Sequence, residues 1–209
     1  QIRVRTGIQV KVLSNSEQRF IRYKAIAIKA SEFQKTIQKG TAIADVGFGS
    51  MQASVFDKDS LISTQNLPLG VLKLRQILTH AKLSAQAEQS LVMELIDNEL
   101  LTFRKMYLKD REIKHLIAIG DPILTMYYKL NGITCSDRLT AEKFNSFFEW
   151  MRTKTRAQLE DAFDVNGEYA SMMFPTVAIY KRMLEVTGAE ILWVPGIRMA
   201  DGTAAELSL

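Results

Sequence analysis

The pattern of hydrophobic and polar residues predicts three strands in the first third of the chain. Residues 41–46 form an apolar segment with a carboxylate near its end, residues 51–56 alternate between apolar and polar types, and residues 60–67 follow as a third segment. The short segments 47–50 and 57–59 between them are rich in glycine, serine and aspartate, as tight turns are. Strands joined in sequence by such turns pair antiparallel, so we expect a three-stranded meander.

The region before the meander predicts a strand and a helix. Residues 8–13 alternate and are rich in β-branched types, which is typical of a strand. Ser14 or Asn15 then offers a helix N-cap, with Glu17 or Gln18 in the first turn. After this cap, apolar residues recur three or four positions apart, as on one face of a helix: Ile21, Ala25 and Ile28.

Helical periodicity dominates after residue 70. We expect helices at 71–78, at 85–106, from Pro122 onward, at 141–151, at 156–163, at 169–186 and near Ala204. Two short apolar strands, 115–119 and 191–194, interrupt them. The order of elements indicates a mixed α/β protein, with one sheet and helices packed on it, in a single domain over residues 1–209.

Composition and charge limit the classes of binding partner that we expect. The chain has 209 residues, of which 47% are hydrophobic, enough to bury a core, and its net charge of +4 favours anionic ligands slightly. Lys and Arg form no long tract and do not alternate with aromatic residues, so we expect no nucleic acid partner. No apolar run approaches the roughly 20 residues of a membrane span, so we expect no membrane partner. The one cysteine, Cys135, excludes an intrachain disulfide and fits a reducing cytosol, so we expect a cytoplasmic location.

The turn after the first strand of the meander carries candidate phosphate chemistry. The strand ends at Asp45, and Gly47-Phe48-Gly49-Ser50 follows. Glycines there would permit positive φ and a close approach of phosphate, while successive N–H groups would form an anion-binding nest. The Asp45 carboxylate could hold Mg²⁺, and the Ser50 hydroxyl could donate to a phosphoryl oxygen. The alternative from these residues alone is an ordinary β-turn with a solvated aspartate at the strand end.

With its surroundings, this turn resembles a known family. The exopolyphosphatase/guanosine pentaphosphate phosphohydrolase family has D-I-G-G-G-S-T-E at such a strand end, which is similar to DVGFGSMQ at residues 45–52. Other family motifs have similar segments in this chain, in the order in which the family has them. S-G-x-E-E-A-R-L is similar to residues 14–21, before the turn. After the turn come S-L-P-L-G-A-x-R-L at 66–74, a strand and G-G-T turn at 117–122, L-P-A at 174–176 and G-L-R-E-G at 197–202. The resemblance spans nearly the whole chain.

The resemblance implies a fold and a place in a larger protein. The family has the actin/sugar-kinase/heat-shock-ATPase fold, whose lobes are ribonuclease H-like. The chain would then be the C-terminal lobe of a two-lobed phosphatase, a domain fragment with the N-terminal lobe of the same protein preceding Gln1. Because the family's site lies between the lobes, these 209 residues would be inactive alone.

The resemblance also implies roles at the turn. Asp45 would hold Mg²⁺ or Mn²⁺. The phosphate would lie against Gly47, Gly49 and Ser50, and Gly120 of the second glycine turn would contact it as well.

The two glutamates that the family uses on the terminal phosphate are not both retained. The first, implied to activate water, falls on Gln18 without a gap and on Glu17 with a one-residue gap; the second, which holds water or metal, falls on Gln52. An amide accepts no proton, and losing a general base costs a factor of about 10² to 10⁴. Phe48 adds bulk to the turn, and Pro122 removes a backbone donor from the second one.

Three functions follow as hypotheses. The first is a Mg²⁺-dependent phosphoanhydride hydrolase that releases terminal phosphate from polyphosphate or from guanosine pentaphosphate. The second is a regulatory member of the same family that binds phosphate or nucleotide and has lost turnover. The third is a structural domain that forms a homodimer through the helix at 85–106.

Overall fold

A computed structural model describes residues 2–29, 31–81, 83–131 and 137–207 of the chain. Contacts divide the chain into two compact units. Unit 1 comprises Gln1–Ser31 and Ile197–Leu209, and unit 2 comprises Glu32–Gly196. The expectations of a single domain over residues 1–209 and of a further lobe before it stay predictions.

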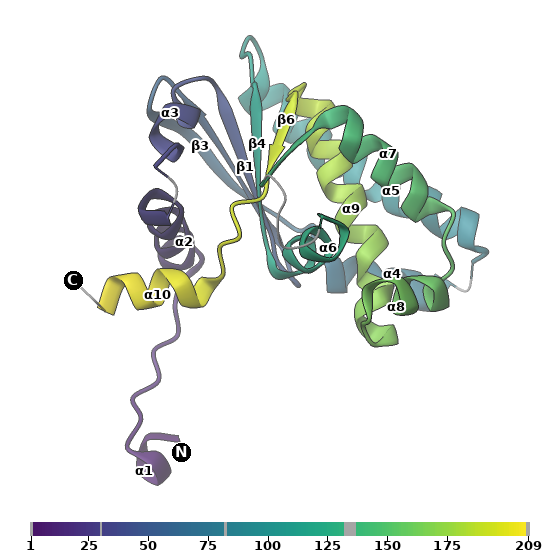
Figure 1. Ribbon diagram of the computed structural model, residues 1–209, viewed down its shortest axis with the longest axis horizontal. Coiled ribbons are helices and arrows are strands. Elements are labelled where there is room, and N and C mark those ends of the chain that lie inside the picture. Colours follow the sequence, from purple (N-terminus) through teal and green to yellow (C-terminus); the bar gives the residue numbers. More distant parts are fainter. Residues whose placement is uncertain (1, 30, 82, 132–136, 208–209) are drawn as a thin grey trace. The chain divides into compact units, whose positions relative to one another are not determined.

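Unit 2 is built on a six-stranded mixed sheet with the strand order β3-β2-β1-β4-β6-β5 (Figure 1). Its strands are β1 (Thr41–Val46), β2 (Met51–Asp57), β3 (Ser60–Leu67), β4 (His115–Ile119), β5 (Arg138–Thr140) and β6 (Ile191–Trp193). Neighbours β1 and β2, β2 and β3, and β5 and β6 pair antiparallel. β4 lies parallel to both β1 and β6, and helices form the crossovers that parallel pairs require.

The predicted meander is confirmed. β1, β2 and β3 occupy the expected segments, and Lys58 and Asp59 join the last two with φ values of 48° and 66°. Two successive left-handed residues are typical of a hairpin turn whose twist matches that of its strands. β5 has no counterpart among the predicted strands, because three residues carry too little alternation to separate them from a loop.

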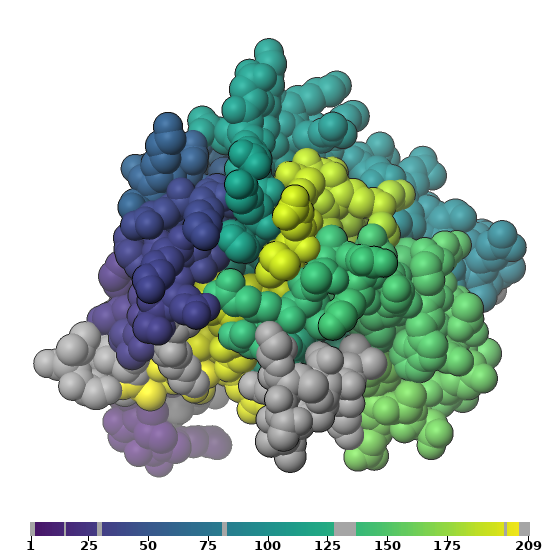
Figure 2. All heavy atoms as spheres, turned by 45° about the horizontal axis from the view of Figure 1, so that its top comes forward, coloured from purple at the N-terminus to yellow at the C-terminus, as the bar shows by residue number. Residues whose placement is uncertain are grey.

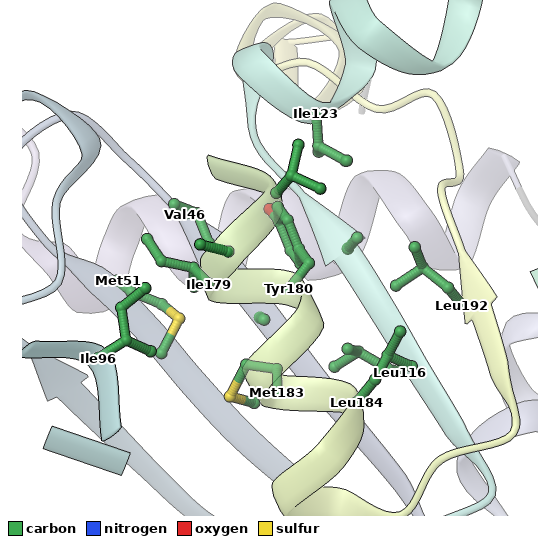
Figure 3. Close-up of a cluster of buried hydrophobic side chains, with 14 of the residues drawn as sticks. Val46, Met51, Ile96, Leu116, Ile123, Ile179, Tyr180, Met183, Leu184 and Leu192 are labelled. Atoms are coloured by element: carbon green, nitrogen blue, oxygen red, sulfur yellow. The ribbon is translucent and has the colours of Figure 1, made fainter. Parts of the chain in front are cut away.

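Helices cover the sheet, and α9 is central among them (Figure 1). In unit 2 they are α3 (Phe33–Ile37), α4 (Val71–Ala81), α5 (Ala85–Phe103), the π-helix η1 (Arg104–Leu108), α6 (Asp121–Asn131), α7 (Ala141–Arg152), α8 (Arg156–Phe163) and α9 (Gly167–Thr187). α9 contacts β1, β4 and each of α4 to α8. Figure 3 shows Tyr180, Met183 and Leu184 of α9 among buried residues of the strands, such as Leu116 and Leu192.

The two faces of the sheet differ in what covers them. Ala44 and Val46 of β1 belong to the hydrophobic cluster around α9. Because side chains alternate along a strand, Asp45 between them points to the other face. Phe56 of β2 lies on that other face and meets Phe33 of α3, with ring centroids 6.4 Å apart.

The helix predicted at 85–106 is α-helical only to Phe103. Arg104–Leu108 continue it as a π-helical turn. Phe103 and Leu108, five residues apart, are both buried, with 1% and 7% of their surface exposed. A turn with i to i+5 spacing allows both to face the core, which α-helical spacing would not.

Unit 1 holds α1 (Ile2–Thr6), α2 (Asn15–Lys29) and α10 (Met199–Leu207). α2 and α10 pack so closely that a Cβ on Gly202 would meet the backbone of Ile21. The strand predicted at 8–13 is wrong, because a strand needs a neighbour to receive its backbone hydrogen bonds and none of the described strands pairs with this segment. Its apolar residues are exposed instead: Ile8, Val10 and Val12.

The described helices include none that combines the length and the apolar character needed to cross a membrane.

Candidate functional site

The predicted phosphate site lies at one edge of the sheet in unit 2. β1 and β4 are parallel, with Asp45 in register with Ile119, so both strands end at the same edge. The turns after them, residues 47–50 and Gly120, are therefore neighbours. Asp45 is 4% exposed and stands directly opposite Gln52 on β2, so the two side chains share one face of the sheet.

The 47–50 turn is held in place by hydrogen bonds on two sides. Within the turn, the N–H of Gly47 donates to the carbonyl oxygen of Ser50 at 2.9 Å. From outside, the first residues of α4 donate to the turn: Val71 N–H to the Gly47 carbonyl at 3.2 Å, and Leu72 N–H to the Phe48 carbonyl at 3.0 Å. Two of the N–H groups at the start of α4, which have no acceptor within the helix, therefore donate to the turn.

These contacts fix the direction of the donors in the turn. In a planar trans peptide, the carbonyl of one residue and the N–H of the next point in opposite directions. With the carbonyls of Gly47 and Phe48 directed at α4, the N–H groups of Phe48 and Gly49 point away from it. Among the described residues, neither of these groups nor the N–H of Ser50 has an acceptor.

Three successive open N–H groups form a site for an anion. The Ser50 hydroxyl adds a fourth donor, since it makes no hydrogen bond within the described part of the chain. Ser50 is half-buried, whereas Phe48 and Gly49 are exposed. The turn therefore carries four donors that the described chain leaves open to a ligand.

The glycines act differently from the prediction. Gly47 and Gly49 do not adopt positive φ, so the expected left-handed conformation is wrong for both. The position that cannot carry a side chain is Gly70, because a Cβ there would overlap the backbone of Phe48 and Gly49. Gly70 thus lets α4 reach the turn. Gly70 belongs to the L-P-L-G motif of the family resemblance, but the motif did not indicate that this glycine is needed for a close contact.

The second turn supports the first and offers fewer donors. Gly120 has a φ of +140°, and a Cβ on it would overlap the carbonyl oxygen of Val46. The Tyr180 hydroxyl donates to the carbonyl of Ile119 at 2.6 Å and holds the end of β4 from beneath. α6 then starts with Asp121, a negative charge, and Pro122, which has no N–H. The predicted helix start at Pro122 is confirmed, and Gly120 remains only a candidate contact for phosphate.

Two further predicted residues, Glu17 and Gln18, belong to α2 in unit 1. Glu17 Oε2 accepts from the N–H and the hydroxyl of Ser14 at 2.8 and 2.9 Å, and the Ser14 hydroxyl accepts from the Glu17 N–H. This is a capping box, so Ser14 is the N-cap. Glu17 Oε1 lies 2.9 Å from Lys11 Nζ, and Gln18 donates to the carbonyl of Leu13. Lys11 first, and then Ser14, lower the pKa of the Glu17 carboxyl to about 2.

The residues around the turn fit a metal shared with a ligand. Within the described residues, His, Cys, Asp and Glu form no group of three or more that could hold a cation. Asp45 offers one carboxylate and Gln52 one amide oxygen on the same face of the sheet. Mg²⁺ is commonly held by one or two carboxylates together with phosphate oxygens and water. Asp45 with a bound phosphate fits that pattern, whereas a cation held by protein alone does not.

Solved structures share this fold. No family model and no curated protein matches the chain. A Ppx/GppA family member from Aquifex aeolicus is similar with a TM-score of 0.77 and 16% identity, over 99% of this chain and 67% of its own. An exopolyphosphatase from Cytophaga hutchinsonii gives 0.76 and 13%, over 99% and 67%. An exopolyphosphatase-like protein gives 0.75 and 11%, over 99% and 68%.

At such identities the likeness establishes the fold. The chain has the mixed α/β, actin-like fold of the Ppx/GppA proteins, and the fold predicted from the motifs is confirmed. This chain spans about two thirds of the length of those proteins.

Proposed function

We propose that the 47–50 turn binds the terminal phosphoryl group of a phosphoanhydride, and that the protein is an exopolyphosphatase-type hydrolase acting on polyphosphate or guanosine pentaphosphate. The observation that carries this proposal is the set of open N–H groups of Phe48, Gly49 and Ser50. A phosphoryl group has charged oxygens, and hydrogen bonds to charged acceptors are about twice as strong as neutral ones. The likeness to exopolyphosphatase structures supports the choice of substrate class.

The chain's own residues would bind and orient the substrate. The backbone of the turn and the Ser50 hydroxyl hold the terminal phosphoryl oxygens. Asp45, with the Gln52 amide beside it, would hold Mg²⁺ or Mn²⁺ against that group. A bound cation would supply positive charge that stabilises the negative charge on the phosphoryl oxygens and on the oxygen of the leaving phosphate.

A second candidate, a protein that binds phosphate without turnover, is favoured by the state of the expected catalytic groups. Gln52 and Gln18 are amides and cannot take a proton from water. Glu17 can, but a pKa of about 2 is far from the value near the working pH that suits a general base. Its carboxylate is also engaged by Lys11 and Ser14.

One experiment tests the proposal and separates the two candidates. Phosphate release from long-chain polyphosphate and from guanosine pentaphosphate, with Mg²⁺ or Mn²⁺, is measured for the complete natural protein and for its Gln18→Glu/Gln52→Glu variant. Turnover by the wild type, not exceeded by the variant, supports the hydrolase. Turnover that appears only in the variant, a gain of about 10² to 10⁴, supports the binding protein. Absence of both release and calorimetric phosphate binding in both proteins would refute both.

A further inference from the structure

A large cavity of unit 2 lies where the long helix α5 ends. Its volume is about 770 Å³, and its walls come from η1, the loop after it and the last turn of α9. Four cationic side chains line it: Arg104, Lys105, Lys109 and Arg111. In Figure 2 the teal segment that leads into β4 stands out from the surface.

The backbone around the cavity is unusual in two places. η1 is a π-helical turn, a rare conformation that is frequent at functional sites. Its buried ends, Phe103 and Leu108, anchor it in the core. Asp110 then takes a left-handed φ of 60°, which is uncommon for a residue with a side chain. The cations are thus presented by a turn that is held at both ends.

Most acidic groups near the cavity already have partners. Arg111 lies 3.3 Å from a carboxylate oxygen of Asp57. The carboxylate of Glu185 lies 2.7 Å from Lys181 and 2.6 Å from Arg182. These pairs neutralise one cation and one anion of the cavity wall.

The remaining cations have no such partners. Arg104, Lys105 and Lys109 make no ion pair or hydrogen bond through their side chains with any residue in the described ranges. All three side chains are exposed, so water and salt weaken their mutual repulsion, and together they make the mouth of the cavity positive.

Helix capping alone does not account for this charge. The C-terminus of α9, at Gly188, and the end of the α5–η1 helix, at Leu108, line the same cavity, and each carries about half a negative charge. Asp110 adds one more, against three positive charges from Arg104, Lys105 and Lys109. A surplus of roughly one positive charge remains, which favours an anion in the cavity.

We infer that this cavity binds an anion with several phosphoryl groups, of the inorganic triphosphate class, at a site separate from the 47–50 turn. A guanidinium binds phosphate oxygens in pairs, and lysines add mobile point charges, so Arg104 with Lys105 and Lys109 suits this ligand.

The cavity lies at the other end of the sheet from the turn. Its loop leads into β4 at His115, which is in register with Thr41 at the start of β1, whereas the turn follows the end of β1. Six strand residues span about 20 Å. This site does not depend on the proposed function.

Two-dimensional ¹⁵N NMR of the whole 209-residue chain tests the inference, with sodium triphosphate as the probe at low ionic strength. We expect the amide signals of residues 104–110 to shift in a saturable way. The dissociation constant obtained from those shifts should rise about tenfold in the double variant Lys105→Gln/Lys109→Gln, because two charges that face the ligand are lost. The matched control Lys35→Gln/Lys143→Gln removes the same charge from α3 and α7 and should leave it unchanged.

The outcomes are distinct. Equal weakening by both double variants would show a general charge effect and overturn the site, as would no shift at 104–110. Sodium sulfate at the same ionic strength should bind more weakly, and equal binding would overturn the preference for several phosphoryl groups. Shifts at 104–110 without shifts at 48–50 would count against the proposed function and support this site.

Discussion

The 47–50 turn and the start of α2 were both marked by the same family resemblance, and they differ in how their polar groups are used. In the turn, the N–H groups of Phe48, Gly49 and Ser50 are open to a ligand. At the helix start, every oxygen of the Glu17 carboxylate has a donor within the chain, from Ser14 or Lys11.

The difference separates binding from catalysis. A polar group whose hydrogen-bonding capacity is already taken up within the chain is less available to a ligand. By this criterion the turn is prepared to bind phosphate. Glu17 is engaged in capping α2, and its pKa of about 2 makes it a weak base. Phosphate binding is therefore better supported than activation of water by this glutamate.

The largest effect should come from closing the approach between α4 and the turn. In Gly70→Ala the new Cβ would overlap the backbone of Phe48 and Gly49, so we expect a loss of about 3 kcal/mol in the free energy of unfolding and loss of phosphate binding. Urea unfolding and phosphate titration measure both.

Gly49→Ala is the matched control, because a Cβ there meets no atom within 4 Å and the backbone is not left-handed. We expect a change within about 0.5 kcal/mol. Similar losses in Gly49→Ala and Gly70→Ala would contradict the assignment of the close contact to Gly70.

Local patterns explain what the sequence predicted of the fold. The meander has alternation and turn residues within one short stretch, and its strands agree with the prediction. Residues 8–13 alternate as well, but no described strand pairs with them, and Ile8 and Val12 are exposed. β5 depends on pairing with β6, about 50 residues later, which local pattern does not contain.

The same limit applies to the site. The sequence located the turn and Asp45, but it could not tell which glycine was needed for conformation and which for space. Gly120 is needed for both, Gly70 for space, and Gly49 for neither. The motif also does not indicate that the Glu17 carboxylate is already engaged in the helix cap, because the ion pair with Lys11 depends on where the chain places Lys11.

A smaller effect should come from removing one donor of the turn. Ser50→Ala deletes the hydroxyl and leaves the three N–H groups, so we expect phosphate to bind about tenfold more weakly, since one hydrogen bond to a charged group is worth about 1.5–3 kcal/mol. Isothermal titration calorimetry measures this, with Ser60→Ala on the exposed tip of β3 as the control. Unchanged affinity would mean that the hydroxyl does not face the ligand.

The smallest effect, on ionisation alone, sharpens the comparison at the helix start. The pKa of Glu17 is lowered from 4.5 to about 2 by Lys11 first and by Ser14 next. Since the folded value lies below the unfolded one, Glu17 stabilises unit 1 above about pH 4.5, and this contribution is lost as the pH falls towards 2. Carboxyl ¹³C NMR between pH 2 and 6 should follow the Glu17 signal. Lys11→Gln should raise this pKa more than Ser14→Ala does, because Ser14→Ala keeps the backbone N–H. A wild-type pKa near 4.5 would instead mean that the carboxylate is not engaged by the cap, and Glu17 would again be a candidate base.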